Sequence, residues 1–287
     1  MINIHNRLDI PKIILVEGLP NSGKTTTLSI VKDFLKKKFL KTKVLYEDDL
    51  DNMLDNHCNA YLTNEEFKEF LKKHKPIEKE LLKIREEFSN GYIIRYWKNK
   101  NVLTDEAFKE LESFDFYNLP LEDHFELVDL MWNKFLRSIK KDDYIYVVEC
   151  ALIQNPMHVS VVRDNKKPEF FYERVLNIQS KLSNFNHLVL YISHNDIKNV
   201  LLNNSKRSIG WNEAILYQYT KGNQFGISRK LTGLEGLQSA YEELLNIQLN
   251  AVEQLNENKI IITNDSYDLN EFSMKIENKL SKYIGIL

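Results

Sequence analysis

One short segment limits the fold of this chain more than any other feature. Residues 18–25 read Gly-Leu-Pro-Asn-Ser-Gly-Lys-Thr and match the pattern G-x-x-x-x-G-K-[ST] in full. The apolar run Ile13–Val16 precedes the segment, and Leu28, Val31 and Leu35 follow it at helical spacing. A strand, a loop bounded by glycines and a helix in this order can wrap a phosphate group with backbone N–H groups at a helix N-terminus. We therefore predict that this segment binds a nucleoside triphosphate.

The residue types of this loop suggest which side chain contacts the phosphates and which one contacts the metal. Lys24 would bridge the β- and γ-phosphates, and the hydroxyl of Thr25 would be a ligand of Mg²⁺. ATP and Mg²⁺ are therefore the expected cofactors, although the sequence leaves open whether GTP replaces ATP. The residues expected to contact the nucleotide are Gly18, Pro20, Asn21, Ser22, Gly23, Lys24, Thr25 and Thr26.

Continuous apolar runs alternate with helical patterns along the chain, which is typical of a doubly wound α/β fold with a parallel sheet. The five predicted strands are Ile13–Val16, Val44–Tyr46, Tyr144–Val148, Leu188–Ile192 and Lys259–Ile262. We expect a single domain, 1–287, with a helical insertion at about 50–141 between the second and third strands. This insertion is aromatic-rich and would supply the acceptor site.

A glycine-rich region lies at about 203–236 and contains five of the nine glycines of the chain. The region opens with Lys206-Arg207 and later carries Arg229-Lys230. Mobile positive charge after the fourth strand suits a lid that closes over a phosphate group, and Arg207 is the predicted charge clamp. A disordered surface loop is the alternative interpretation.

An acidic residue follows each predicted strand: Glu17, Glu47, Glu149, Asp196 and Asp265, in chain order. Parallel strands present their carboxyl ends at one sheet edge, where ligands bind. Glu149 ends the third strand, so it is the predicted Mg²⁺ carboxylate together with Thr25. Glu47 follows the second strand and is the candidate base that accepts a proton from the acceptor, with Asp48 and Asp49 as competitors.

Two further acids, Asp142 and Asp143, precede the third strand. Their place in the chain puts them at the opposite edge of the predicted sheet, away from the carboxyl ends of the strands. We therefore exclude both from the predicted metal site.

The charge balance argues against a nucleic-acid or membrane-surface binder. The chain has 39 Lys and Arg against 41 Asp and Glu, a net charge of −2. A polyanion binder needs a basic face, and the basic runs here are short and flanked by acids. With two cysteines and no run long enough to span a bilayer, we expect a reduced, cytoplasmic protein. A small molecule is its expected partner, and the chain could form a homodimer.

The segment from Ile14 to Thr26, with its Glu-Gly pair at the start of the loop, resembles the P-loop nucleoside and nucleotide kinases. This group contains thymidylate kinase and the deoxynucleoside kinases. The resemblance implies the strand order 2-3-1-4-5 and matches Glu47 to the base that deoxynucleoside kinases carry after the second strand. The chain departs from the family after Glu149, where Cys150 and Ala151 stand in place of an arginine.

These observations favour an ATP- and Mg²⁺-dependent phosphotransferase that acts on a small molecule, with a nucleoside or nucleotide as the first choice. Two alternatives remain open. The same machinery could act on a sugar, an antibiotic or another metabolite hydroxyl, which the absent arginine favours. The chain could also be a P-loop ATPase switch without a small acceptor.

Overall fold

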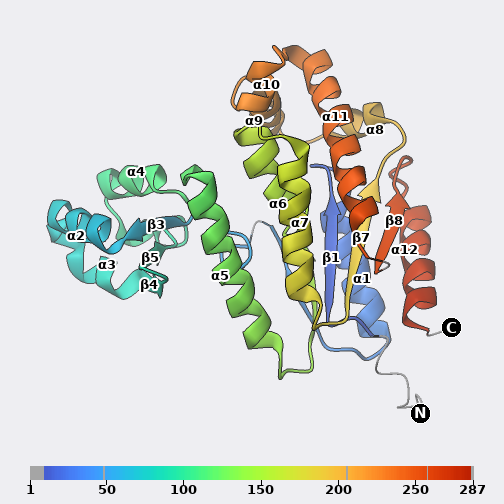
Figure 1. The fold of residues 1–287 in the computed structure, drawn as a ribbon, viewed down its shortest axis with the longest axis horizontal. Coiled ribbons are helices and arrows are strands. Elements are labelled where there is room, and N and C mark those ends of the chain that lie inside the picture. Colours follow the sequence, from blue (N-terminus) through green and yellow to red (C-terminus); the bar gives the residue numbers. More distant parts are fainter. Residues whose placement is uncertain (1–9, 48, 205, 257, 286–287) are drawn as a thin grey trace. The chain divides into compact units, whose positions relative to one another are not determined.

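The computed structural model describes residues 10–47, 49–204, 206–256 and 258–285. The chain forms two compact units, whose elements are coloured along the sequence in Figure 1. The first unit joins Met1–Tyr46 to Lys141–Leu287, and the second is Glu47–Lys140. The second unit corresponds to the insertion expected at about 50–141.

A five-stranded parallel sheet forms the centre of the first unit. Its strands lie in the order β2, β6, β1, β7, β8. Counted within this sheet alone, in chain order, they run 2-3-1-4-5. The parallel sheet predicted from the five apolar runs is confirmed, and β1, β6 and β7 are buried along their whole length. The strands are β1 (Ile13–Gly18), β2 (Thr42–Leu45), β6 (Ile145–Glu149), β7 (His187–Ser193) and β8 (Lys259–Thr263).

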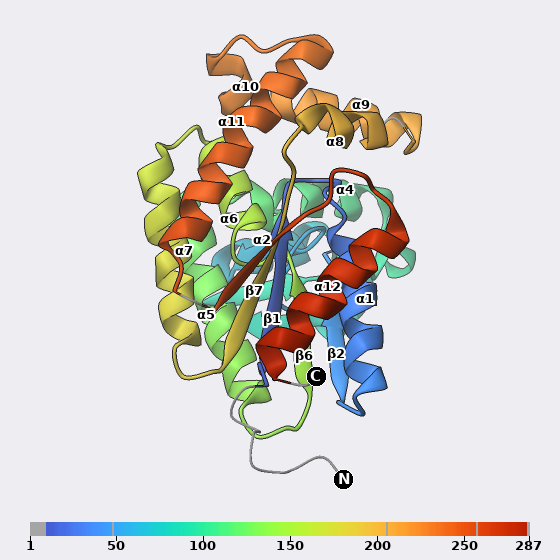
Figure 2. The ribbon, with the colours of Figure 1, turned by 90° about the vertical axis from the view of Figure 1, so that its right-hand side faces the viewer.

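Helices cover both faces of this sheet, as Figure 2 shows, with α1 and α12 on one side and α7 on the other. The helix α1 (Lys24–Lys37) packs against α12 (Leu269–Ile284), and their apolar faces share one core cluster with the strands. On the other side, α7 (Pro168–Leu182) contacts α11 (Gly233–Gln254). Two short helical segments precede α7, namely α6 (Gln154–Met157) and a π-helix over His158–Arg163.

The glycine-rich region at about 203–236 is helical, so the alternative of a disordered loop is wrong. It contains the end of α8 (Ile197–Asn204), α9 (Ile209–Thr220), α10 (Gln224–Ser228) and the start of α11. Close packing explains one glycine, because a Cβ on Gly226 would lie 2.2 Å from the backbone oxygen of Thr220. Gly226 therefore allows α10 to approach the end of α9 closely.

The second unit is not purely helical, which corrects the sequence-based expectation. Its three-stranded antiparallel sheet has the order β3, β5, β4, with β3 at Ala60–Thr63, β4 at Arg85–Phe88 and β5 at Gly91–Ile94. The sheet packs with helices around a core that includes Leu62, Phe67 and Ile94. The helices are α2 (Asn64–Lys73), α3 (Glu78–Ile84), α4 (Asp105–Ser113) and α5 (Leu121–Ile139), with short 3-10 segments at Lys75–Ile77, Lys100–Val102 and Phe116–Asn118.

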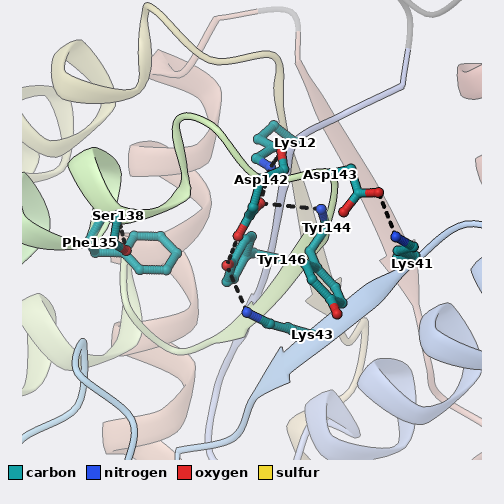
Figure 3. Close-up of polar contacts among 9 residues, drawn as sticks. All are labelled: Lys12, Lys41, Lys43, Phe135, Ser138, Asp142, Asp143, Tyr144 and Tyr146. Carbon is teal, nitrogen blue, oxygen red and sulfur yellow. Dashed lines mark hydrogen bonds and ion pairs between the residues drawn. The ribbon is translucent and has the colours of Figure 1, made fainter.

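Asp142 and Asp143 lie just before β6, so their predicted place at the amino end of the strand is confirmed. Figure 3 shows that both are engaged in ion pairs with lysines. Lys12 donates to Asp142, and Lys41 donates to Asp143 at 2.7 Å. The hydroxyl of Tyr146 also donates to Asp142. These acids therefore tie the start of β6 to the segments that enter β1 and β2.

Every helix in the described part of the chain is too short or too polar to cross a membrane.

The start of α2 offers a test of the second unit's local structure. The Thr63 hydroxyl accepts a hydrogen bond from Glu66 N–H at 3.3 Å, and the Glu66 carboxylate accepts one from Thr63 N–H at 2.8 Å. Thr63→Ala should lower the free energy of unfolding of this unit by about 1 kcal/mol, because it removes one half of the capping box. Urea unfolding followed by tryptophan fluorescence measures this change in a Trp211→Phe background. The other two tryptophans, Trp97 and Trp132, both lie in the second unit, so the signal then reports on that unit.

Thr63→Ser keeps the hydroxyl and serves as the control, which should unfold within a few tenths of a kcal/mol of the parent. Equal midpoints for the alanine and serine variants would show that the box does not stabilise the unit.

Candidate functional site

The loop between β1 and α1 has a backbone that favours glycine at both ends. Gly18 has φ +150° and Gly23 has φ +104°, while Asn21 between them has φ +63°. A Cβ on Gly18 would lie 2.6 Å from the backbone oxygen of Ile192, and one on Gly23 would lie 2.7 Å from Asn264 Nδ2. Side chains at the two glycines are therefore excluded by conformation and by space.

The helix α1 begins directly after this loop, at Lys24. Its N-cap is Gly23, which offers no capping side chain, and its first turn, within the described residues, contains no acid. A helix start of this kind attracts an anion through its unpaired N–H groups and its dipole. Two more buried polar atoms of the loop, Asn21 Nδ2 and Ser22 Oγ, have no hydrogen-bond partner among the residues that the structure describes. This donor set fits a phosphate group.

Lys24 is the first residue of α1, and only 5% of it is exposed. Its ammonium group donates to the backbone oxygen of Leu19 at 2.9 Å, so the side chain folds back over the loop. Burying an ammonium group is costly unless it is paired. A phosphate oxygen would be a stronger partner for Lys24 than the neutral carbonyl.

Thr25 and Glu149 are brought together by the structure. The hydroxyl of Thr25 donates to Glu149 Oε1 at 2.8 Å. Glu149 is the last residue of β6 and is 4% exposed, whereas Thr25 is exposed. A hydroxyl and a carboxylate at this distance form part of the oxygen set that Mg²⁺ prefers, so the two residues fit the predicted metal role.

The turn after β8 supports the loop in a way that was not predicted. Asn264 Nδ2 donates to Ser22 O at 3.0 Å, and the Tyr267 hydroxyl donates to Asn21 O at 3.0 Å. The Tyr267 ring stacks on buried His194, with 5.4 Å between centroids. Burial lowers the pKa of His194 to about 4, so the imidazole is neutral at pH 7. In the sequence, only the position of Asn264 and Tyr267 after a strand signals this role.

Of the predicted arginines, Arg207 contacts the loop between β1 and α1. Its Nε donates to Asn21 Oδ1 at 3.2 Å, and its guanidinium group lies 4.9 Å from the centre of the Trp211 ring. Arg229, the other arginine of the predicted lid, instead forms an ion pair with Glu243 at 2.7 Å. Arg163, which follows β6 in the chain, pairs with Asp164 at 2.7 Å.

Glu17, at the end of β1, is fully buried. Its two carboxylate oxygens accept hydrogen bonds from Leu152 N–H at 2.7 Å and Gln154 N–H at 3.0 Å. Burial raises the pKa of Glu17 to about 7, although these N–H groups and the charge of Lys24 act in the opposite direction. The strand-end position of Glu17 suggested a site residue, but its partners could not be identified from the sequence.

The proposed base, Glu47, lies in a turn two residues after β2 and is the first residue of the second unit. Its role stays a prediction. Of its competitors, Asp48 lies outside the described residues. Asp49 is exposed and accepts a hydrogen bond from Asp51 N–H at 3.0 Å, as residues in acidic turns often do.

Comparison with known proteins finds similarity in structure only. No protein-family model and no curated protein sequence matches the chain. A solved structure of thymidylate kinase from Candida albicans is similar with a TM-score of 0.42 and 15% identity, over 95% of this chain and 90% of that one. The function is therefore argued below from the residues of the loop and its neighbours.

Gly23→Ala tests whether the loop geometry binds phosphate. The alanine must adopt a left-handed backbone and place its Cβ against Asn264, so affinity for Mg·ATP should fall about tenfold or more. Isothermal titration calorimetry measures the change.

Gly210→Ala is the matched control, because its Cβ would meet no atom within 4 Å and the site is exposed. Equal affinities in the two variants would contradict a role of the loop backbone in binding.

Proposed function

We propose that this protein is an ATP- and Mg²⁺-dependent phosphotransferase that acts on a small molecule, with a nucleoside or nucleotide as the favoured acceptor. One observation carries the proposal. A complete phosphate loop holds a buried Lys24 against its own backbone, next to the hydrogen-bonded pair of Thr25 and Glu149. An anion-binding loop, a cation and two oxygen ligands are the parts that bind a metal–triphosphate complex.

In this proposal the loop and its neighbours bind the triphosphate in four ways. The N–H groups at the start of α1 contact phosphate oxygens, and Lys24 exchanges the carbonyl of Leu19 for a phosphate oxygen. Thr25 and Glu149 would hold Mg²⁺, which, when bound, neutralises charge on the β- and γ-phosphates. Arg207, next to Asn21, supplies positive charge to the group in transfer.

The transfer step forms a bond between an acceptor oxygen and the γ-phosphorus and breaks the bond from that phosphorus to the oxygen bridging to the β-phosphate. When the acceptor is a hydroxyl, its proton passes to a base, and we assign this role to Glu47. The aromatic-rich second unit provides the acceptor pocket in this proposal, since aromatic rings stack well on planar bases.

One feature favours a different acceptor for the same machinery. Cys150 and Ala151 follow Glu149 and are 0% and 5% exposed, so no arginine can extend from these positions toward a phosphate on the substrate. A sugar, an antibiotic or another metabolite hydroxyl does not require such an arginine. A P-loop ATPase switch would need no acceptor at all.

A panel of acceptors separates these functions. With ATP and Mg²⁺ but no acceptor, the purified protein should hydrolyse ATP slowly. It should form ADP rapidly only when the matching acceptor is added from a panel of nucleosides, nucleotides, sugars and aminoglycosides. Lys24→Ala should abolish this transfer, because the ammonium group that holds the phosphates is lost. Lys38→Ala, on a lysine after α1, is the charge-matched control and should keep it. Fast turnover without any acceptor would favour the ATPase switch instead.

Glu47→Gln tests the assignment of the base. It should lower kcat by ~10²–10⁴ and leave the affinity for Mg·ATP little changed, since only proton acceptance is removed. Steady-state kinetics with the acceptor found above, together with calorimetry, measure both quantities. Asp49→Asn is the matched control, and if it causes the larger loss, the base is Asp49.

A further inference from the structure

The turn after β6 is anchored to the buried end of β1. This turn begins at Cys150, whose φ of +63° is uncommon for a residue other than glycine. Cys150 N–H donates to Val16 O at 3.1 Å, and Cys150 O accepts from Asn155 N–H at 3.0 Å. A turn with an unfavourable backbone conformation needs contacts that outweigh its cost.

Glu17 provides the strongest of these contacts. Its carboxylate spans two N–H groups of the turn, one on each oxygen, at Leu152 and Gln154. Hydrogen bonds to a charged acceptor are about twice as strong as neutral ones. The same turn begins directly after Glu149, which accepts the Thr25 hydroxyl. Glu17 and Glu149 therefore hold the two ends of one short segment next to the phosphate loop.

We propose that Glu17 is a positioning residue, which fixes the turn after β6 so that the Glu149 carboxylate is held beside Thr25 for Mg²⁺. This inference rests on the proposed function. It explains why a carboxylate occupies a position with no exposed surface, where an apolar side chain would cost less to bury. Groups that orient metal ligands commonly act through such hydrogen bonds.

The charge state of Glu17 controls this contact. The ionised carboxylate accepts hydrogen bonds on both oxygens, whereas protonation converts one oxygen into a donor. The titratable groups that act on it, among the described residues, are Lys24 of α1 and Tyr191 of β7; the turn contributes only backbone N–H groups. Since the pKa of Glu17 is about 7, the contact should strengthen as the pH rises through 7.

The contribution of Glu17 to the stability of the fold should change with pH in the opposite direction to the strength of this contact. The pKa of Glu17 is raised from 4.5, so the folded chain binds the proton more tightly than the unfolded chain does. The Glu17 contribution to the free energy of unfolding is therefore largest below about pH 4.5 and declines as the pH rises to about 7. A residue with a purely structural role would not strengthen metal binding over a range where it lowers stability.

The test compares the full-length protein with Glu17→Gln, which cannot ionise. Calorimetry with ATP is run once with excess Mg²⁺ and once with EDTA. In the variant, the ratio of the affinity in Mg²⁺ to the affinity in EDTA should fall about tenfold or more at about pH 8.5. At about pH 5.5 the two proteins should bind alike, because Glu17 is then protonated. Titration of the nucleotide itself cancels in the ratio of the two proteins.

Tyr191→Phe is the control, because Tyr191 pairs with Glu17 across the sheet but donates its hydroxyl hydrogen to Gln248. It should keep the full Mg²⁺ effect. Glu17→Asp keeps the charge and should restore part of the Mg²⁺ effect. If circular dichroism shows that the glutamine variant does not fold, Glu17→Asp replaces it as the test variant. Thermal melting adds a second readout, in which Tm of Glu17→Gln minus that of wild type should increase from about pH 5 to about pH 8.

The outcomes are distinct. If wild type gains affinity from Mg²⁺ and Glu17→Gln keeps the same gain at both pH values, or if Glu17→Asp loses as much as Glu17→Gln, the positioning role is wrong and the proposed function stands. If wild type binds no nucleotide, the proposed function fails and the inference fails with it.

Discussion

A phosphate loop works only while its backbone keeps a conformation that most side chains would prevent. In this chain, Gly18 and Gly23 allow that conformation at the two ends of the loop, and Lys24 folds back onto it. The loop lies where the central strand β1 passes into α1, so the most buried part of the sheet fixes its position. The remaining features at this sheet edge either contact the loop or hold a group that does.

The support for the loop comes from the ends of three strands of the first unit, β1, β6 and β8. Asn264 and Tyr267, after β8, bind backbone oxygens of the loop, while Glu149, at the end of β6, binds the first turn of α1. Glu17 then joins β1 to the turn after β6. Because these contacts involve backbone groups or buried side chains, the loop is shaped before any ligand arrives. Such preorganisation lowers the cost of binding a highly charged group.

The fold was largely predictable, and the contacts within the site were not. Continuous apolar runs identified all five parallel strands, because strands covered on both faces contain few polar residues. The antiparallel sheet of the second unit was missed, since β4 reads Arg-Glu-Glu-Phe and lacks that signal. Spacing alone located Lys24 and Thr25. It could not identify the partners of Glu17 or Asn264, which are bonded to residues 135 and 242 positions away in the chain.

The absence of an arginine after Glu149 has a structural cause and a consequence. Cys150 is buried with a left-handed backbone, where a long charged side chain would be removed from solvent. Under the proposed function, the positive charge for transfer would therefore come from another element. Recruiting Arg229 would break its ion pair with Glu243, whereas Arg207 contacts an amide oxygen and an indole ring, neither of which carries a charge. A phosphoryl group held by the loop would thus gain a charge-assisted contact with Arg207 without the loss of an ion pair among the residues that the structure describes.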